Sequence, residues 1–210
     1  MNQIFDFLFE QYSKSETIDI VLEIIAVIFG FLSVWYSKQN KIWVFPTGMI
    51  STSIFVYLLL KWGLLGDMMI NAYYFIMSVY GWYIWTRKVD EFHVTPISKT
   101  TIKEKRISGF IFIATLVFVY IVYKTFDKWT DWVAYADTIT TAIFFVGMWL
   151  MARRKIENWI FWIIGDIISV PLYFYKGFTF TSFQYLGFTI IAIFGCLAWK
   201  KHLNKNQQTA

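Results

Sequence analysis

The chain has 210 residues, of which 58% are hydrophobic, 22% aromatic and only 16% charged, and this composition excludes an ordinary soluble globular domain. Its apolar residues form runs near the length that an α-helix needs to cross about 30 Å of hydrocarbon, which predicts an integral membrane protein. The net charge of +5 does not indicate nucleic-acid binding, because the basic residues stand at the ends of the apolar runs, where membrane topology requires them.

Seven apolar runs predict seven transmembrane helices, at residues 18–36, 43–60, 64–85, 107–123, 132–152, 158–173 and 179–199. The start of the chain carries acidic residues and no basic cluster, so we expect no secretory signal peptide there. The predicted divisions are an extracytoplasmic N-terminal segment (1–17), a first three-helix bundle (18–86), a cytoplasmic loop (87–106), a linker helix (107–124), a second three-helix bundle (132–200) and a cytoplasmic tail (201–210).

The distribution of basic residues predicts the orientation. With the N-terminus outside, 14 of the 19 Lys and Arg residues fall in cytoplasmic segments and 5 in outer segments. Because cytoplasmic loops carry the excess of positive charge, we predict that the N-terminus lies outside and the C-terminus in the cytoplasm.

An internal repeat links the two predicted bundles. At a spacing of 114 residues, similar residues align at the pairs Glu23/Asp137, Trp35/Trp149, Gly81/Gly195 and Trp85/Trp199. Within the second helix of each bundle a spacing of 116 aligns the pairs Trp43/Trp159, Ser53/Ser169 and Tyr57/Tyr173, which requires a two-residue adjustment in two loops and sets Ile50 in the place of Asp166.

The repeat predicts the architecture. A single linker helix separates the triplets, and an odd number of intervening spans makes the two triplets parallel. We therefore predict an all-α membrane protein with seven transmembrane helices in a parallel 3+1+3 repeat. Parallel repeats are one of the standard plans of transporters, whose sites lie near the midplane where the halves meet.

The sixth predicted helix carries the main candidate site. Five residues, Trp159, Trp162, Asp166, Ser169 and Tyr173, are spaced at helical intervals and share one stripe, while the other faces are almost purely apolar. A carboxylate at the centre of a membrane helix costs on the order of 2.5–3.5 kcal/mol, and such residues usually face a bundle interior or a cavity. Aromatic rings beside an anion suit a small aromatic cation. The alternative is a carboxylate that only holds helices together.

Two further helices supply polar candidates. Asn71 and Tyr74 lie on the third predicted helix, and Gln184 and Tyr185 lie on the seventh. Amide groups both donate and accept hydrogen bonds, which suits ribose hydroxyls or a carboxamide. The alternative is hydrogen bonding between helices, which is common in membranes.

Two acidic residues mark the outer ends of equivalent helices. Glu23 and Asp137 occupy matching places in the repeat, one to two turns from the predicted outer surface. We expect a structural or gating role for them.

Three features resemble the PnuC family of nicotinamide riboside transporters: Glu23, the run SVYGWYIWTRK at 78–88 and the run RRKIENWIFWIIGDIISVPLYFYKG at 153–177. The resemblance covers nearly all of residues 19–201. It implies a SWEET-like 3+1+3 fold in the bacterial inner membrane, facilitated diffusion of nicotinamide riboside, and trapping by a cytoplasmic kinase. Many members of the family have Asn where this chain has Asp166, and the related PnuT carriers transport thiamine, another flat aromatic cation, which is the alternative substrate.

Enzymatic activity is not expected. The chain has one cysteine, Cys196, and two histidines, His93 and His202, which both fall in polar segments, so the predicted spans offer no metal site or catalytic histidine. We predict no cofactor and no metal. A structural or receptor subunit that does not transport is the alternative of another class, and a homo-oligomer is compatible with the sequence.

Overall fold

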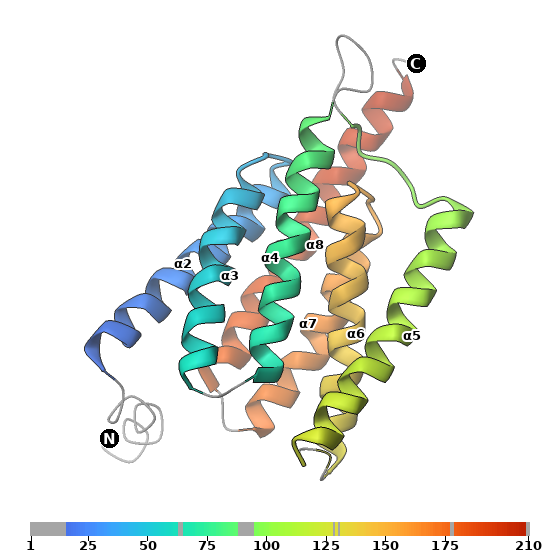
Figure 1. The fold of residues 1–210 in the computed structure, drawn as a ribbon. Helices are drawn as coiled ribbons and strands as arrows, with labels where there is room; N and C mark the ends of the chain where they lie inside the picture. The colour runs from blue at the N-terminus through green and yellow to red at the C-terminus, as the bar shows by residue number, and fades with distance from the viewer. Residues whose placement is uncertain are drawn as a thin grey trace.

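The computed structural model describes residues 16–62, 65–87, 95–127, 129, 131–176 and 179–208. Within these residues the chain forms long α-helices (Figure 1). The predicted N-terminal segment, except for its last two residues, and part of the predicted cytoplasmic loop lie outside the described residues. The helices are α2 (Thr17–Lys38), α3 (Val44–Lys61), α4 (Leu65–Thr86), α5 (Ile102–Thr125), α6 (Trp132–Ala152), α7 (Asn158–Tyr175) and α8 (Thr179–Gln208).

Six of the seven described helices have the length and composition of membrane spans, and α4 is the exception. In the described part of the chain, α2, α3, α5, α6, α7 and residues 181–204 of α8 are each long and apolar enough to cross a bilayer. Large apolar side chains such as Ile76, Phe110 and Phe183 project outward from the bundle, where a lipid environment stabilises them. The prediction of an all-α, multi-pass membrane protein is confirmed.

The helices pack as two sets of three with one helix at the side. In the first bundle α2 packs on α3 and α3 on α4, and in the second bundle α6 packs on α7 and α7 on α8. The bundles meet along α2 with α8 and α4 with α6, while α5 packs mainly against α6. In Figure 1, α2, α4, α6 and α8 finish at the top, and we call this the upper end of the molecule; α3, α5 and α7 finish at the lower end.

Equivalent contacts recur 114 residues apart in the two bundles. A Cβ atom on Gly81 would lie 2.3 Å from the Phe45 ring, and one on Gly195 would lie 2.5 Å from the Trp159 ring. Each of these rings also meets a tryptophan edge-on, Trp85 for Phe45 at 5.0 Å and Trp199 for Trp159 at 5.6 Å. The two bundles therefore close around their glycines in the same way.

This register corrects one prediction from the sequence. A spacing of 116 in the second helix of each bundle aligns Trp43 with Trp159, but the structure places Phe45 in the position of Trp159. Trp43 precedes the first turn of α3 and is 58% exposed, whereas Trp159 is 1% exposed. The two residues are of the same type but do not occupy equivalent positions. At the uniform spacing of 114, Thr52 and not Ile50 corresponds to Asp166.

The turns at the upper end follow the same register. Asn40 and Arg154 both have left-handed backbones, with φ of 57° and 59°, and each closes the turn between the first two helices of its bundle. Arg154 donates to the Asn40 side-chain oxygen at 2.8 and 3.0 Å and to the Thr95 carbonyl. Burial lowers the pKa of Arg154 to about 10, which still leaves it charged at neutral pH.

The polar stretch before α5 is ordered by the basic run of the second bundle. Ser98 exchanges backbone hydrogen bonds with this turn, accepting from Ile156 at 3.0 Å. Thr101 and Glu104 form a capping box, so α5 begins at Ile102, five residues before the predicted start. The Glu104 carboxylate also pairs with Arg153 and Lys155 at 3.0 and 3.1 Å. The basic residues thus connect α5 to the second bundle.

The glycine contacts lead to a test of the packing. Replacing Gly195 with alanine would press a methyl group into the Trp159 ring, and overpacking of this kind costs roughly 1–3 kcal/mol. We expect the melting temperature of the purified protein in detergent to fall by several degrees. Gly109→Ala is the matched control, because nothing lies within 4 Å of its Cβ position and the helix propensity improves. Equal melting temperatures for the two variants would contradict the close packing.

Candidate functional site

The candidate site begins with Asp166, halfway along α7. Its side chain is buried, with 3% of the residue exposed. Among the residues that the structure describes, its carboxylate has no hydrogen-bond or ion-pair partner. The hydroxyls of Tyr74 in α4 and Tyr185 in α8 lie within electrostatic range of it, so both bundles contribute residues near it.

Aromatic rings from four helices cluster beside this part of α7. Phe144 of α6 packs so closely on Gly165, the neighbour of Asp166, that a Cβ atom there would lie 2.3 Å from its ring. Its centroid lies 5.6 Å from that of Trp162 and 6.0 Å from that of Tyr185, nearly parallel to the latter. Tyr74 approaches Trp162 at 6.4 Å. We call these four rings, Tyr74, Phe144, Trp162 and Tyr185, the aromatic cage.

The cage extends toward the lower end and toward α2. The rings of Tyr173 and Tyr185 lie 5.0 Å apart and their hydroxyls hydrogen-bond to each other. On the other side Tyr185 contacts Phe188, whose ring lies 4.7 Å from that of Phe31 in α2. The site therefore lies where the two bundles meet.

Two other acidic residues near helix ends, Asp137 and Asp19, are paired. Asp137 accepts from Lys176 at 2.8 Å and from the Tyr123 hydroxyl at 3.2 Å. Asp19 pairs with Lys61 at 2.9 Å. A buried carboxylate that holds helices together is expected to look like these two, because burying an unpaired charge is costly. Asp166 differs from them in having no such partner among the described residues.

One more buried polar group lies on the same face of α7. Ser169 is fully buried, and its hydroxyl oxygen has no hydrogen-bond partner within the described residues. It follows Asp166 by one helical turn and so faces the same way. Buried polar groups are nearly always paired, and an exception indicates a place where another molecule completes the bonding. Asp166 and Ser169 together give the cage an unfilled polar stripe.

Known proteins show the same organisation. The family described as nicotinamide mononucleotide transporter matches residues 20–201 of this chain. The chain belongs to this family.

Individual relatives fit that membership. The nicotinamide riboside transporter PnuC of Escherichia coli strain K12 is 22% identical, over 85% of this chain and 84% of that protein. The riboflavin/roseoflavin transporter RibM of Streptomyces davaonensis is 25% identical, over 84% and 83%. The crystal structure of the vitamin B3 transporter PnuC has a TM-score of 0.66 at 21% identity, over 90% of this chain and 84% of that one, and so shares the fold. The resemblance to the PnuC family is confirmed, and the protein is a transporter and not an enzyme.

The structure brings together five of the eight binding residues that the sequence predicts. Trp162, Asp166, Tyr173, Tyr74 and Tyr185 all lie in or beside the aromatic cage. Trp162, Asp166 and Tyr173 come from α7, and α4 and α8 each supply one tyrosine.

Ring contacts do not connect the other predicted residues to the cage. Trp159 precedes Asp166 by seven residues, about 10 Å along the helix, and is packed between Gly195 and Trp199 in the core. The Asn71 amide donates to the Asp67 carbonyl of its own helix at 3.0 Å. Gln184 is half-buried next to Tyr185. Of the two outer acidic residues, Asp137 is paired as described above, and Glu23 is half-buried in α2.

Sequence reasoning missed the ring at the centre of the cage. Phe144 is one of 22 phenylalanines in the chain, and nothing in its neighbourhood distinguishes it. The usable signal was Gly165, because a glycine beside a buried carboxylate in a helix indicates close approach by another group. Phe145 was missed as well; it stacks on Tyr73 at 3.9 Å, and its carbonyl accepts from the Tyr73 hydroxyl at 3.0 Å.

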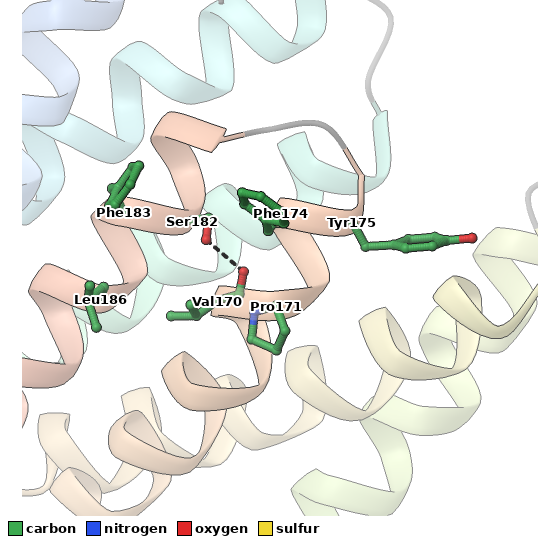
Figure 2. Close-up of a pocket in the computed structure, with 7 residues that line it drawn as sticks. All are labelled: Val170, Pro171, Phe174, Tyr175, Ser182, Phe183 and Leu186. Atoms are coloured by element: carbon green, nitrogen blue, oxygen red, sulfur yellow. Dashed lines mark hydrogen bonds between the residues drawn. The ribbon is translucent and has the colours of Figure 1, made fainter.

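A groove between α7 and α8 is a separate feature. Figure 2 shows Pro171 and Phe174 facing Phe183 and Leu186 across it, with the Ser182 hydroxyl donating to the Val170 carbonyl at 2.7 Å. Most of its lining is apolar and exposed on the outside of the bundle, as expected for a surface that meets lipid. No charged residue lines it, so it offers nothing to a cation. The aromatic cage remains the candidate site.

The contrast between paired and unpaired carboxylates gives a stability test. Asp166→Asn replaces a buried, uncompensated charge with a neutral amide of the same shape, so we expect the melting temperature of the ligand-free protein to stay the same or rise by a few degrees. Asp137→Asn loses a charged partner, which costs roughly 1.5–3 kcal/mol, and should lower it. If both variants fall equally, Asp166 serves to hold the helices together.

Proposed function

We propose that this protein carries nicotinamide riboside across the inner membrane by facilitated diffusion, through a site at Asp166 between the two bundles. The observation that supports this most is a buried carboxylate that lacks a partner in the described part of the fold and is enclosed by aromatic rings. The pyridinium ring of nicotinamide riboside is a flat cation of the kind that such a site attracts. The family membership and the PnuC relatives support the same substrate.

The cage offers each part of the ligand a partner. Trp162, Phe144 and Tyr185 would take the pyridinium between their faces, where a desolvated cation–π contact contributes about 2 kcal/mol. Asp166 would counter the positive charge or accept from a ribose hydroxyl. Tyr74 and Tyr173 would close the cage from the sides.

The remaining predicted residues take secondary roles in this proposal. Asn71 and Gln184 would interact with polar groups as the ligand enters or leaves, because Asn71 precedes Tyr74 by one turn of α4 and Gln184 lies next to Tyr185 in α8. Trp159 would support α7 from the core. Glu23 and Asp137 would shape the outer ends of α2 and α6.

The proposed architecture is a parallel 3+1+3 arrangement of seven transmembrane helices. It is supported by contacts that recur 114 residues apart and by helices that run in the same order of directions in both bundles (Figure 1). The excess of basic residues predicts that the N-terminus is outside, so the upper end is cytoplasmic. Ligand released there would be trapped by a cytoplasmic kinase.

Thiamine is the second candidate substrate, and the charge of Asp166 is the observation that favours it. A full negative charge suits a permanent cation better than the neutral ring system of riboflavin, which the relative RibM transports. Competition between the three vitamins for the purified protein would rank them. We expect nicotinamide riboside or thiamine to bind more tightly than riboflavin, and preference for riboflavin would contradict the role given to the carboxylate.

Uptake into proteoliposomes tests the proposal. We expect entry of labelled nicotinamide riboside that persists when a protonophore collapses the proton gradient. Asp166→Ala should reduce it at least tenfold, because a hydrogen bond to a charged group contributes roughly 1.5–3 kcal/mol. Thr52→Ala is the control, since Thr52 lies at the equivalent place in α3 and bonds within its own helix at 2.8 Å. Strict dependence on the gradient, or equal uptake by both variants, would refute this mechanism.

A further inference from the structure

Two buried tryptophans cross between the bundles at the upper end. The Trp85 indole nitrogen in α4 donates to the Met151 carbonyl of α6 at 3.2 Å, and the Trp199 indole nitrogen in α8 donates to the Ser37 carbonyl of α2 at 2.9 Å. Both indoles are buried, with 3% and 0% exposed. Each bond therefore joins one bundle to the other. We call Ser37, Trp85, Met151 and Trp199 the crossed-indole seam.

The seam is built around a pseudo-twofold axis. Trp85 and Trp199 are 114 residues apart, and so are their acceptors, Ser37 and Met151. A rotation that superposes one bundle on the other therefore also superposes one of these hydrogen bonds on the other. On the axis, the Ser37 hydroxyl meets the Met151 sulfur at 3.5 Å. Just beyond it Arg154 meets Asn40, again a pair of equivalent positions. The bundles are joined here by the same contacts from both sides.

The bonds of the seam can open without unwinding a helix. Both acceptor carbonyls lie in the last turn of their helices and also accept a backbone N–H of the turn that follows, Asn40 for Ser37 at 2.9 Å and Arg154 for Met151 at 2.8 Å. They therefore keep a partner when an indole leaves. An indole that leaves such a carbonyl breaks one hydrogen bond between bundles and none within them. The two bundles can therefore separate at the seam while their own helices stay intact.

The start of α7 lies against the seam and has unused polar groups. Trp159 packs edge-on against Trp199, and its buried indole nitrogen has no hydrogen-bond partner among the described residues. The buried side-chain oxygen of Asn158 is likewise unpartnered there. Unpaired buried groups cost free energy that a second arrangement could recover. They supply new partners for groups that the seam releases.

We propose that the crossed-indole seam is the cytoplasmic gate of this transporter, closed in this structure, and that its two indole bonds open each time ligand leaves the aromatic cage. The seam lies at the upper end of the same interface between bundles, α2 with α8 and α4 with α6, that contains the cage. This rests on the proposed function, because a gate needs a transported ligand.

A reversible cross-link tests the gate. Ser37→Cys and Met151→Cys, combined with Cys196→Ser to remove the native thiol, place two thiols on the axis. Joining them by oxidation or with a short bis-thiol reagent should lower nicotinamide riboside uptake into proteoliposomes at least tenfold, and cleaving a disulfide should restore it. Full cross-linking with normal uptake would show that the seam is a fixed pivot.

The control cross-link lies within one bundle. Val170→Cys and Ser182→Cys lie on neighbouring turns of α7 and α8 beside the groove between these helices, where the Ser182 hydroxyl donates to the Val170 carbonyl in Figure 2. Joining them should leave uptake within twofold of the reduced protein. A tenfold loss here as well would mean that cross-linking harms transport without closing a gate, and would remove the support for the seam.

Access from the cytoplasmic side tests the gate without any transported ligand. A single cysteine in place of Ser169, in the Cys196→Ser background, is labelled with a cationic methanethiosulfonate reagent from the upper side. Changing Trp85 and Trp199 to Phe keeps the rings and removes both donors, and should speed labelling at least tenfold. An unchanged rate would overturn the gate, whereas lack of uptake by the wild-type protein with this acceleration would overturn only the proposed substrate.

Discussion

The Asp166 carboxylate constrains the rest of the molecule, because a charge buried halfway along an apolar helix must be compensated by something. Its neighbours are aromatic rings with polarisable faces and two tyrosine hydroxyls, and none of them carries a positive charge. The paired Asp137 and Asp19 show how this chain neutralises a carboxylate when the purpose is structural. In the proposed function, a cationic ligand supplies the partner that Asp166 lacks among the described residues.

The symmetry of the scaffold and the asymmetry of the site have separate origins. Glycines, the aromatic rings that pack on them, and residues with left-handed backbones at turns all recur 114 residues apart. These contacts determine how each bundle packs. At the site the equivalent side chains differ in size. Phe144 packs on Gly165 in the second bundle, while the residues 114 positions earlier in the first bundle are Gly30 and Ser51, which contact each other. At this position the second bundle has a ring where the first has a small side chain. The proposed ligand, with one flat cationic end, is unequal in the same way.

Hydropathy and helical spacing were sufficient for the outline of the fold. The helix positions follow from apolar runs, and the stripe through Trp162, Asp166 and Tyr173 correctly predicted which face of α7 turns inward. The position of the site along α7 was not predictable from this stripe. Trp159 and Trp162 both lie on it, but only Trp162 is part of the cage. The register of α3 was mispredicted, since Trp43 matches Trp159 by residue type but lies before its helix. The place of Phe144 in the cage depends on packing between helices, and no local sequence pattern indicates it.

A structure of the protein with bound nicotinamide riboside tests the central claim most directly. The account predicts ligand density between the bundles, with the pyridinium within about 6 Å of the Trp162 ring centroid and a ligand atom within hydrogen-bonding or ion-pair distance of Asp166. Density in the outer groove of α7 and α8, or an Asp166 carboxylate that turns to another side chain while the cage stays closed around itself, would contradict it.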